Sequence, residues 1–520
     1  MKTRLMAAAA PLVLGAGLLG GMPMTALAKT APAKDAAAAA TPAYSGPFAQ
    51  PSTLPFHAPD FAQYKDSDWQ PAIEAAIAQK RAEIAAIAAS KAKPTFANTV
   101  VAMERAGGMY DRVNNVFGQL TSANTNDTLD AAETALSPQI SALNDDIYLN
   151  DALFARVKAV HDSAAGKALK GEDAMLLSTT YARFVNRGAL LAPAQKAELK
   201  QLNLEIATLE TKFSQTLTNG TAAHAAVFDS AAELKGMSDD AIAAAAKRAA
   251  DQGKPGKYVI PLLNFTQQPA LTELQNRDAR KKLFEASITR TSSGDQFDTT
   301  GIVSQLAVAR AKKAQLLGKP DFATLQMYSS MVTSPKQAMD FMKGFVPALR
   351  ARQDSEAALL TEAARADGVT GDLQPWDWSY YAEKVRKAKY DLDESAIKPY
   401  FDVWNVLENG VFYAATQTYG ITFKRRADLS GYHPSMRVYE VFDKDGSSLA
   451  LFYYDPFSRP NKKGGAWMNN FVDQSYLTGN KPVIVNTLNI DPPAGGQPPL
   501  ASWDNVTTMF LSLIHISEPT

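Results

Sequence analysis

The sequence predicts a mainly α-helical protein with one small β-sheet near the end of the chain. After about residue 60, apolar residues recur at three-, four- and seven-residue spacings with polar residues between them, the pattern of one buried helix face. Runs of β-branched and aromatic residues are concentrated between residues 437 and 488. Of the 520 residues, 46% are hydrophobic and 20% are charged, which indicates a globular protein with a large core.

Charge and cysteine content exclude several classes of function. Lysine plus arginine and aspartate plus glutamate each number 53, so the balance favours neither a nucleic-acid nor an anionic-membrane partner. The sequence has no cysteine, which rules out disulfides and thiolate metal sites. The five histidines are scattered along the chain, at His57, His161, His224, His433 and His515.

The first 28 residues have the features of a secretory signal peptide. A basic start is followed by an apolar run over residues 6–19 and by the small-x-small site Ala26-Leu27-Ala28. A membrane-spanning helix is the weaker interpretation, because the apolar run is short. We therefore expect a cleaved signal peptide over residues 1–28, a mature chain that begins at Lys29, and a periplasmic location.

Residues 29–55 are rich in Ala, Pro, Thr and Ser and have few large apolar side chains. Such a segment buries too little surface to offset the entropy lost on ordering, so it is predicted to be a disordered linker. A lipid anchor would need a cysteine near the cleavage site, and none is present. After cleavage the protein is expected to have no membrane attachment.

An N-terminal helical region is predicted over residues 56–270. The clearest helices of the chain are expected over residues 69–87, 199–217 and 302–317. Pro193 near the start and Gly220 near the end of the second helix match the usual helix asymmetry, as does Gly318 after the third. We interpret these apolar faces as core packing, and His161 and His224 as isolated helical histidines rather than metal ligands.

The sheet is predicted from three short segments. A hairpin is expected from strands at residues 437–442 and 449–454, joined by the turn Asp443-Lys-Asp-Gly446, in which glycine can adopt a positive φ. A third strand is expected at residues 483–488. The sheet serves either as packing alone or as an exposed edge that binds a substrate backbone by strand addition.

Gly464, Gly465 and Ala466 form a second candidate feature. Two adjacent glycines permit backbone conformations and close approaches that side chains prevent. Their spacing alone favours an ordinary loop.

Most of the chain between residues 60 and 510 carries a family resemblance. It resembles the thimet oligopeptidase and neurolysin-like zinc metallopeptidases, and within them the bacterial peptidyl-dipeptidases. The resemblance rests on Leu373-Gln-Pro-Trp-Asp-Trp-Ser-Tyr-Tyr, on Lys463-Gly-Gly-Ala-Trp-Met and on the run from Ser502 to Phe510.

The resemblance implies an almost wholly helical, two-lobed architecture with a deep channel and a small sheet near the active site. It also implies that residues 271–510 are the N-terminal part of a catalytic domain. Gly464, Gly465 and Ala466 would contact the peptide, and the activity would be release of dipeptides from the C-termini of oligopeptides. The expected partners are short peptides, bound by a monomer.

The zinc motif of that family does not follow at the expected place. Members of the family have His-Glu-x-x-His, in which two histidines one turn apart hold zinc. Here Phe510 is followed by Leu-Ser-Leu-Ile-His-Ile-Ser-Glu-Pro-Thr520. We expect residues 511–520 to be a non-native, adapter-derived tail. We therefore name no catalytic or metal-binding residue and expect an incomplete, inactive chain without the Zn²⁺ of complete members.

Two other functions stay open at this stage. One is an oligopeptidase that cleaves within short peptides, and the other is a secreted helical binding protein without catalysis. The sequence contains no G-x-S-x-G elbow, phosphate-binding loop or cysteine nucleophile that would indicate other catalytic machinery.

Overall fold

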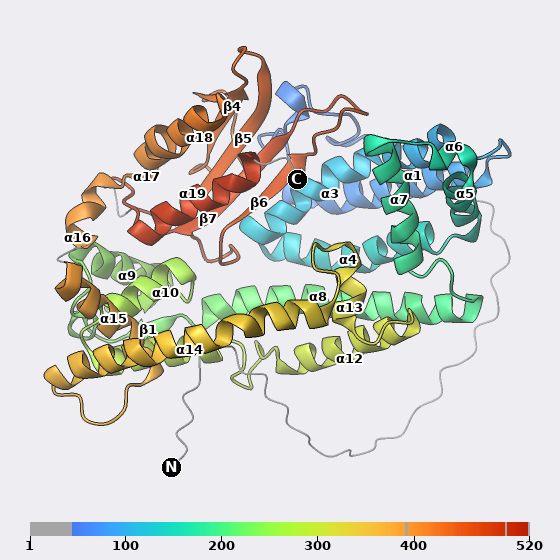
Figure 1. The fold of residues 1–520 in the computed structure, drawn as a ribbon. Coiled ribbons are helices and arrows are strands. Elements are labelled where there is room, and N and C mark those ends of the chain that lie inside the picture. The colour runs from blue at the N-terminus through green and yellow to red at the C-terminus, as the bar shows by residue number, and fades with distance from the viewer. Residues whose placement is uncertain (1–43, 391–393, 494–496, 518–520) are drawn as a thin grey trace.

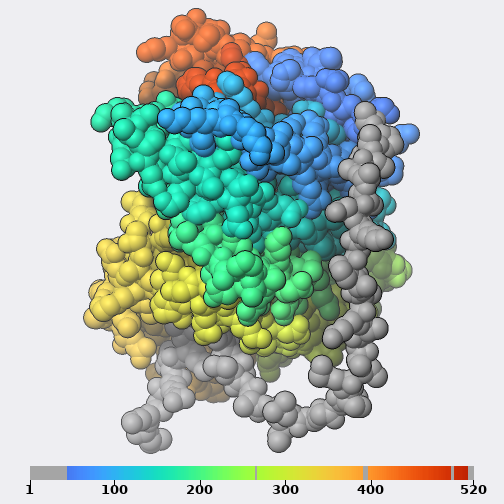
Figure 2. Space-filling model, turned by 90° about the vertical axis from the view of Figure 1, so that its right-hand side faces the viewer, coloured from blue at the N-terminus to red at the C-terminus, as the bar shows by residue number. Residues whose placement is uncertain are grey.

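The computed structural model describes residues 44–390, 394–493 and 497–517. The predicted signal peptide lies outside these residues. Helices dominate the described chain, and a five-stranded sheet lies near its C-terminal end, as predicted (Figure 1). In Figure 2 the blue to green N-terminal helices lie between the orange C-terminal segments at the top and the yellow segment around α14 at the bottom.

The N-terminal helices pack around one large apolar core. Trp69, Ile73 and Ile77 lie on one face of the first helix and are each 1% exposed or less, which confirms the predicted stripe. The helices of this region are α1 (Trp69–Ala89), α2 (Ala102–Arg105), α3 (Gly108–Ala123), α4 (Asp127–Tyr148), α5 (Asp151–Asp162), α6 (Ala164–Lys167), α7 (Gly171–Asn186) and α8 (Pro193–Ala223).

The helix α8 begins at Pro193 and ends close to Gly220, as predicted. Pro193 occupies its first position, where a missing N–H costs nothing. Gly220 lies within the last turn and does not end the helix, which continues to Ala223. A Cβ at Gly220 would be 2.8 Å from Thr291 Cγ2 and 2.9 Å from Phe297 Cβ, so glycine here permits close packing.

The second half of the helical chain runs beneath and beside the sheet. These helices are α9 (Asp239–Asp251), α10 (Asn264–Glu273), α11 (Arg277–Thr289), α12 (Thr300–Leu316), α13 (Phe322–Gln326), α14 (Pro335–Ala366), α15 (Pro375–Tyr390), α16 (Glu394–Ile397), α17 (Val403–Asn405), α18 (Phe412–Tyr419) and α19 (Trp503–Ser517). A short antiparallel pair, β1 (Ala226–Phe228) and β2 (Tyr258–Ile260), follows α8. Gly318, with φ +71°, follows α12 as predicted.

The predicted linker over residues 29–55 is too long. Phe48 is 3% exposed, and its ring centroid lies 4.6 Å from that of Trp69 and 4.3 Å from that of Tyr64. Arg112 Nη2 also donates to the Phe48 carbonyl at 2.9 Å. Phe48, with Tyr44 and Leu54 packed against the same core, anchors the described part of this stretch, and average composition does not reveal such anchors. Residues 29–43 lie outside the described residues.

The large sheet has the strand order β3-β4-β5-β7-β6, with a parallel pair between β5 and β7 and antiparallel pairs elsewhere. The predicted hairpin and third strand are confirmed, and Gly446 in the turn has φ +83°. The sequence reasoning missed two strands, β3 and β6. The strands are β3 (Thr422–Arg425), β4 (Arg437–Phe442), β5 (Ser448–Phe457), β6 (Trp467–Val472) and β7 (Val483–Ile490).

Alternate residues of the central strands enter two different cores. Val438, Leu451 and Val485 belong to the core formed with the N-terminal helices. Tyr439 and Phe452 point to the opposite core, formed with α17, α18 and α19. This two-residue alternation is expected of a sheet covered on both faces. The sheet therefore joins the N-terminal helices to the last described helix.

The long helix α14 is exposed along most of its length. Leu360 and Ala364 near its C-terminal end are buried against α15. Nearer its start, Phe341 and Leu349 are 69% and 64% exposed. Within the described residues, no helix combines the length and apolar character needed to cross a membrane.

Candidate functional site

The loop before β6 is held by one buried asparagine. Asn489 on β7 is fully buried, and its Nδ2 donates to the carbonyls of Lys463 and Gly465, both at 2.8 Å. Gly465 has φ +102°, a conformation that residues with a Cβ rarely adopt. The two glycines thus turn the chain into β6, and the side chain of Asn489 holds the backbone of this turn.

The strand β6 forms one edge of the sheet. Its pairing with β7 runs from Trp467 opposite Thr487 to Val472 opposite Val483. No other described segment pairs with its outer side. Alternate N–H and C=O groups of such an edge point away from the sheet and are free to pair with another extended chain.

A buried glutamine of α3 fixes the inner face of β6. Gln119 Oε1 accepts from Trp467 Nε1 at 3.1 Å and from Asn469 Nδ2 at 2.8 Å. Its Nε2 donates to Tyr432 Oη and Thr487 Oγ1, both at 3.0 Å. With all four bonds made at a fully buried side chain, Gln119 sets the position of β6 relative to the helical region.

The network continues into a buried group of charges. Tyr432 Oη donates to Asp455 Oδ2 at 2.7 Å, and Asp455 also binds Arg459 at 2.6 Å and Lys462 at 3.1 Å. Burial acts to raise the pKa of Asp455, but the hydrogen bond from Arg459 and the charges of Lys462 and Arg459 hold it below its usual value. Burial lowers the pKa of Lys462 to about 7 against the opposing effect of Asp455.

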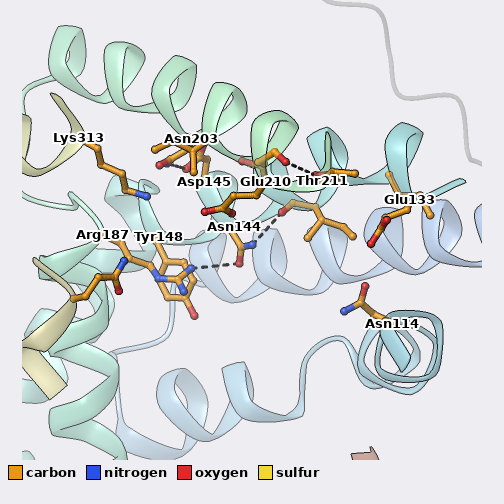
Figure 3. Close-up of a pocket in the computed structure, with 18 of the residues that line it drawn as sticks. Asn114, Glu133, Asn144, Asp145, Tyr148, Arg187, Asn203, Glu210, Thr211 and Lys313 are labelled. Atoms are coloured by element: carbon orange, nitrogen blue, oxygen red, sulfur yellow. Dashed lines mark hydrogen bonds between the residues drawn. The ribbon is translucent and has the colours of Figure 1, made fainter. Parts of the chain in front are cut away.

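A cavity of ≈ 550 Å³ lies in the helical region, between α3, α4, α8 and α12 (Figure 3). Its lining carries both signs of charge, with Lys313 and Arg187 at one end and Glu133 at the other. Burial raises the pKa of Asp145 to about 6, although Asn203 Nδ2 donates to it at 2.6 Å. Burial, followed by repulsion from Arg187, lowers the pKa of Lys313.

A larger cavity of ≈ 910 Å³ adjoins the glycine loop. Gly464 and Gly465 line it together with residues of α8, α9 and the segment after α11. Basic side chains predominate among its charged residues: Arg248, Arg290, Arg459, Lys462 and Lys463, against the single carboxylate of Asp251.

Two smaller hollows follow β6. Ala466, Trp467 and Met468 border one of ≈ 340 Å³ against α19. Asn469 and Asn470 border another of ≈ 370 Å³ against α3. Of the three predicted site residues, Gly464 and Gly465 therefore line the large cavity, whereas Ala466 lies at the hollow beside α19. Their role as peptide contacts stays a prediction.

The residues in the described ranges do not fit a zinc site. No three His, Asp or Glu side chains among them converge in a way that would hold a metal ion. His224 is bonded to the Arg290 carbonyl and to Asp295, and His433 Nδ1 is 2.7 Å from Ser435 Oγ. His515 belongs to α19, but its side chain is outside what is described.

Sequence reasoning missed the residues that position this site. Gln119 looks like an ordinary polar residue of an amphipathic helix, and nothing in the sequence connects it with β6. Likewise, nothing in the sequence around Asn489 indicates that its side chain binds the glycine loop. The basic pair Lys462 and Lys463 directly before the glycines was a signal that could have been used.

Comparison with known proteins gives a consistent family. A model described as Peptidase family M3 matches residues 270–513. The chain is 45% identical over 469 residues to the dipeptidyl carboxypeptidase of Escherichia coli (strain K12), which covers 90% of this chain and 69% of that protein. It is 44% identical to the dipeptidyl carboxypeptidase of Salmonella typhimurium, with 91% and 69% covered. Oligopeptidase A of Salmonella typhimurium is 27% identical, with 89% and 69% covered.

Proposed function

Because this chain belongs to peptidase family M3, we propose that it acts in the release of dipeptides from the C-termini of short peptides. We further propose that the edge of β6 and the loop at Gly464 and Gly465 bind the peptide backbone. The free edge of β6, entered through a glycine turn and flanked by hollows, is the observation that carries this proposal. The names of the relatives at 45% and 44% identity support the reaction.

The geometry suits an extended peptide. A strand laid against β6 would pair with its outward N–H and C=O groups, which gives affinity with little dependence on sequence. The hollow at Ala466 and Met468 and the hollow at Asn469 and Asn470 would receive alternate side chains. Because Gln119 and Asn489 already fix the strand and the loop, little ordering entropy would be lost on binding.

Zinc enters the proposal only at the level of the family. Members of family M3 are zinc-dependent metallopeptidases. The donor set among the described residues does not fit such an ion, so we derive no step through a metal. For the 520-residue chain we propose peptide binding without stoichiometric zinc, and metal analysis of the purified chain tests this. One zinc per chain would contradict it.

The reaction can be tested with a chimera. The part of the Escherichia coli dipeptidyl carboxypeptidase beyond its match to this chain would be fused after Phe510. We expect the chimera to release C-terminal dipeptides from oligopeptides, detected by mass spectrometry, and to lose this activity with a chelator. Cleavage confined to internal bonds would instead favour the oligopeptidase function. A chimera that does not bind peptides would contradict both.

We also propose that the protein is periplasmic and has no membrane attachment, on the basis of the predicted signal peptide over residues 1–28. We propose a monomer on the basis of the family resemblance. N-terminal sequencing of protein from a periplasmic extract is expected to begin at Lys29. An intact Met1 in the cytosolic fraction would contradict the location, and light scattering would test the monomer.

A further inference from the structure

The cavity beside the glycine loop has an excess of positive charge. Its lining includes five basic side chains and one carboxylate, that of Asp251. Asp251 is paired at 2.7 Å with Lys247, which does not line the cavity. The single acidic residue of the lining is thus already occupied by a charge outside it.

Three of the basic residues have acidic partners. Arg248 pairs with Asp491 at 2.6 Å, so these two charges cancel. Arg459 and Lys462 share one carboxylate, that of Asp455. These three basic residues belong to the wall of the cavity, and each is already held there by an acidic partner.

Arg290 and Lys463 have no carboxylate partner among the described residues. Arg290 Nη1 reaches the Leu262 carbonyl at 3.5 Å, the outer limit of a hydrogen bond. Lys463 Nζ is 3.3 Å from Ser122 Oγ, a neutral group. Arg290 directly follows α11 and Lys463 precedes Gly464, so two different segments bring uncompensated charge to one cavity.

The remaining lining is largely apolar. It includes Leu217, Leu262, Leu263 and Phe457, with Pro492 and Pro493. A volume of ≈ 910 Å³ is within the range of ligand sites, about 300–1,000 Å³. The cavity therefore suits a ligand with an apolar body and an anionic group.

We propose that this cavity binds a carboxylate group of a peptide, with Arg290 and Lys463 as its charged contacts. The identification of the ligand as a peptide rests on the proposed function, because the cavity adjoins the loop that leads into β6. The carboxylate comes either from the C-terminus of the peptide or from an acidic side chain. Arginine and lysine bind carboxylates through charge-assisted hydrogen bonds, which are stronger than neutral ones. The site would select peptides by charge, whereas the edge of β6 binds any extended backbone.

The experiment is isothermal titration of the full chain with four ligands. These are an acetylated apolar tetrapeptide with a free C-terminus, its C-terminal amide, the amide with one glutamate, and inorganic phosphate. We expect the free acid to bind about tenfold more tightly than the plain amide, the effect of one charged hydrogen bond. Tighter binding of the glutamate amide than of the free acid would identify the side chain as the source of the carboxylate.

Variants then assign the contacts. Arg290→Gln and Lys463→Gln are each expected to remove most of the difference between acid and amide, while binding of the amide stays unchanged. Arg290→Lys keeps the charge and is expected to retain part of the difference. Lys336→Gln on the exposed start of α14 is the matched control and is expected to change nothing. Thermal unfolding of each variant separates loss of binding from loss of folding.

Two results would overturn the proposal. Equal binding of acid, amide and glutamate amide would remove the carboxylate site and leave the proposed peptide binding intact. Phosphate binding as tight as the free acid would show a site for small anions rather than for peptides. If none of the three peptides binds, the proposed function itself fails.

Discussion

Two cavities of this protein share one wall but differ in charge. The helix α8 lines the cavity of Figure 3 with Asn203 and Glu210, and about two turns after Glu210 it lines the basic cavity with Leu217 and then Thr221. The lining of the first cavity has three carboxylates, those of Glu133, Asp145 and Glu210, and two basic side chains, those of Arg187 and Lys313, so both signs of charge are nearly balanced. In the second, five basic side chains stand against one carboxylate, and Arg290 and Lys463 have no carboxylate partner within the described chain. An excess of one sign of charge, rather than volume, therefore marks a cavity for a ligand of defined sign.

The largest expected effect comes from Gln119→Leu, because this fully buried side chain makes four hydrogen bonds that connect α3 with the sheet region. The substitution removes one buried hydrogen-bond partner from each of Trp467, Asn469, Tyr432 and Thr487, and we expect a loss of about 3–5 kcal/mol of unfolding free energy. Denaturant unfolding measures it. The exposed Gln79→Leu on α1 is the control, with an expected change within about 0.5 kcal/mol. Similar losses of unfolding free energy in Gln119→Leu and Gln79→Leu would mean that the hydrogen bonds of Gln119 do not hold β6.

The substitution Asp145→Asn tests the cavity of Figure 3, whose lining carries both signs of charge. The folded pKa of Asp145, about 6, is above the unfolded value of 3.8, so between these values the folded state binds the additional proton. The Asp145 contribution to stability is thus full below pH 3.8 and is lost as pH rises through about 6. We expect this loss to be on the order of 1–3 kcal/mol in the native chain and absent in Asp145→Asn.

Denaturant unfolding at a series of pH values measures how the free energy of unfolding changes with pH. Asp146→Asn is the matched control, since that carboxylate is half-exposed and pairs with Arg81 and Lys200. A pH slope that persists in Asp145→Asn would assign it to another group.

Gly465→Val examines the loop beside the basic cavity. A Cβ there would meet no atom within 4 Å, so the cost arises from φ +102° alone. Gly446→Val is a close match, because its φ is +83° and its surroundings are equally open, but it lies in the hairpin turn. Both variants are expected to lose about 1–2 kcal/mol of stability. Peptide binding is expected to weaken about tenfold in Gly465→Val alone, as titration would show. Equal weakening in both would make the loop a purely structural element.

The sequence predicted what local pattern determines. The stripe from Trp69 to Ile77 and the turn at Gly446 follow from helical spacing and from glycine chemistry, and both are present. The strand β6 was missed because Asn469 and Asn470 are poor strand formers, and its pairing with β7 supplies what its own residues lack. The pair Lys462 and Lys463 signals part of the charge of the basic cavity, but the contribution of Arg290 was beyond prediction, since Arg290 and Lys463 are 173 positions apart and only the fold brings them to one cavity.

The bond between Gln119 and Thr487 spans 368 positions of the chain. On the ribosome, α3 emerges long before β7 exists, and at about 5–20 residues per second the wait lasts about 20–70 s. During that time the amide of Gln119 has none of its sheet partners, and the apolar face that later covers the sheet is open to solvent. Completion of this core is therefore a late event of biosynthesis, and a nascent chain of this protein is expected to need chaperone protection until its last strands have been made.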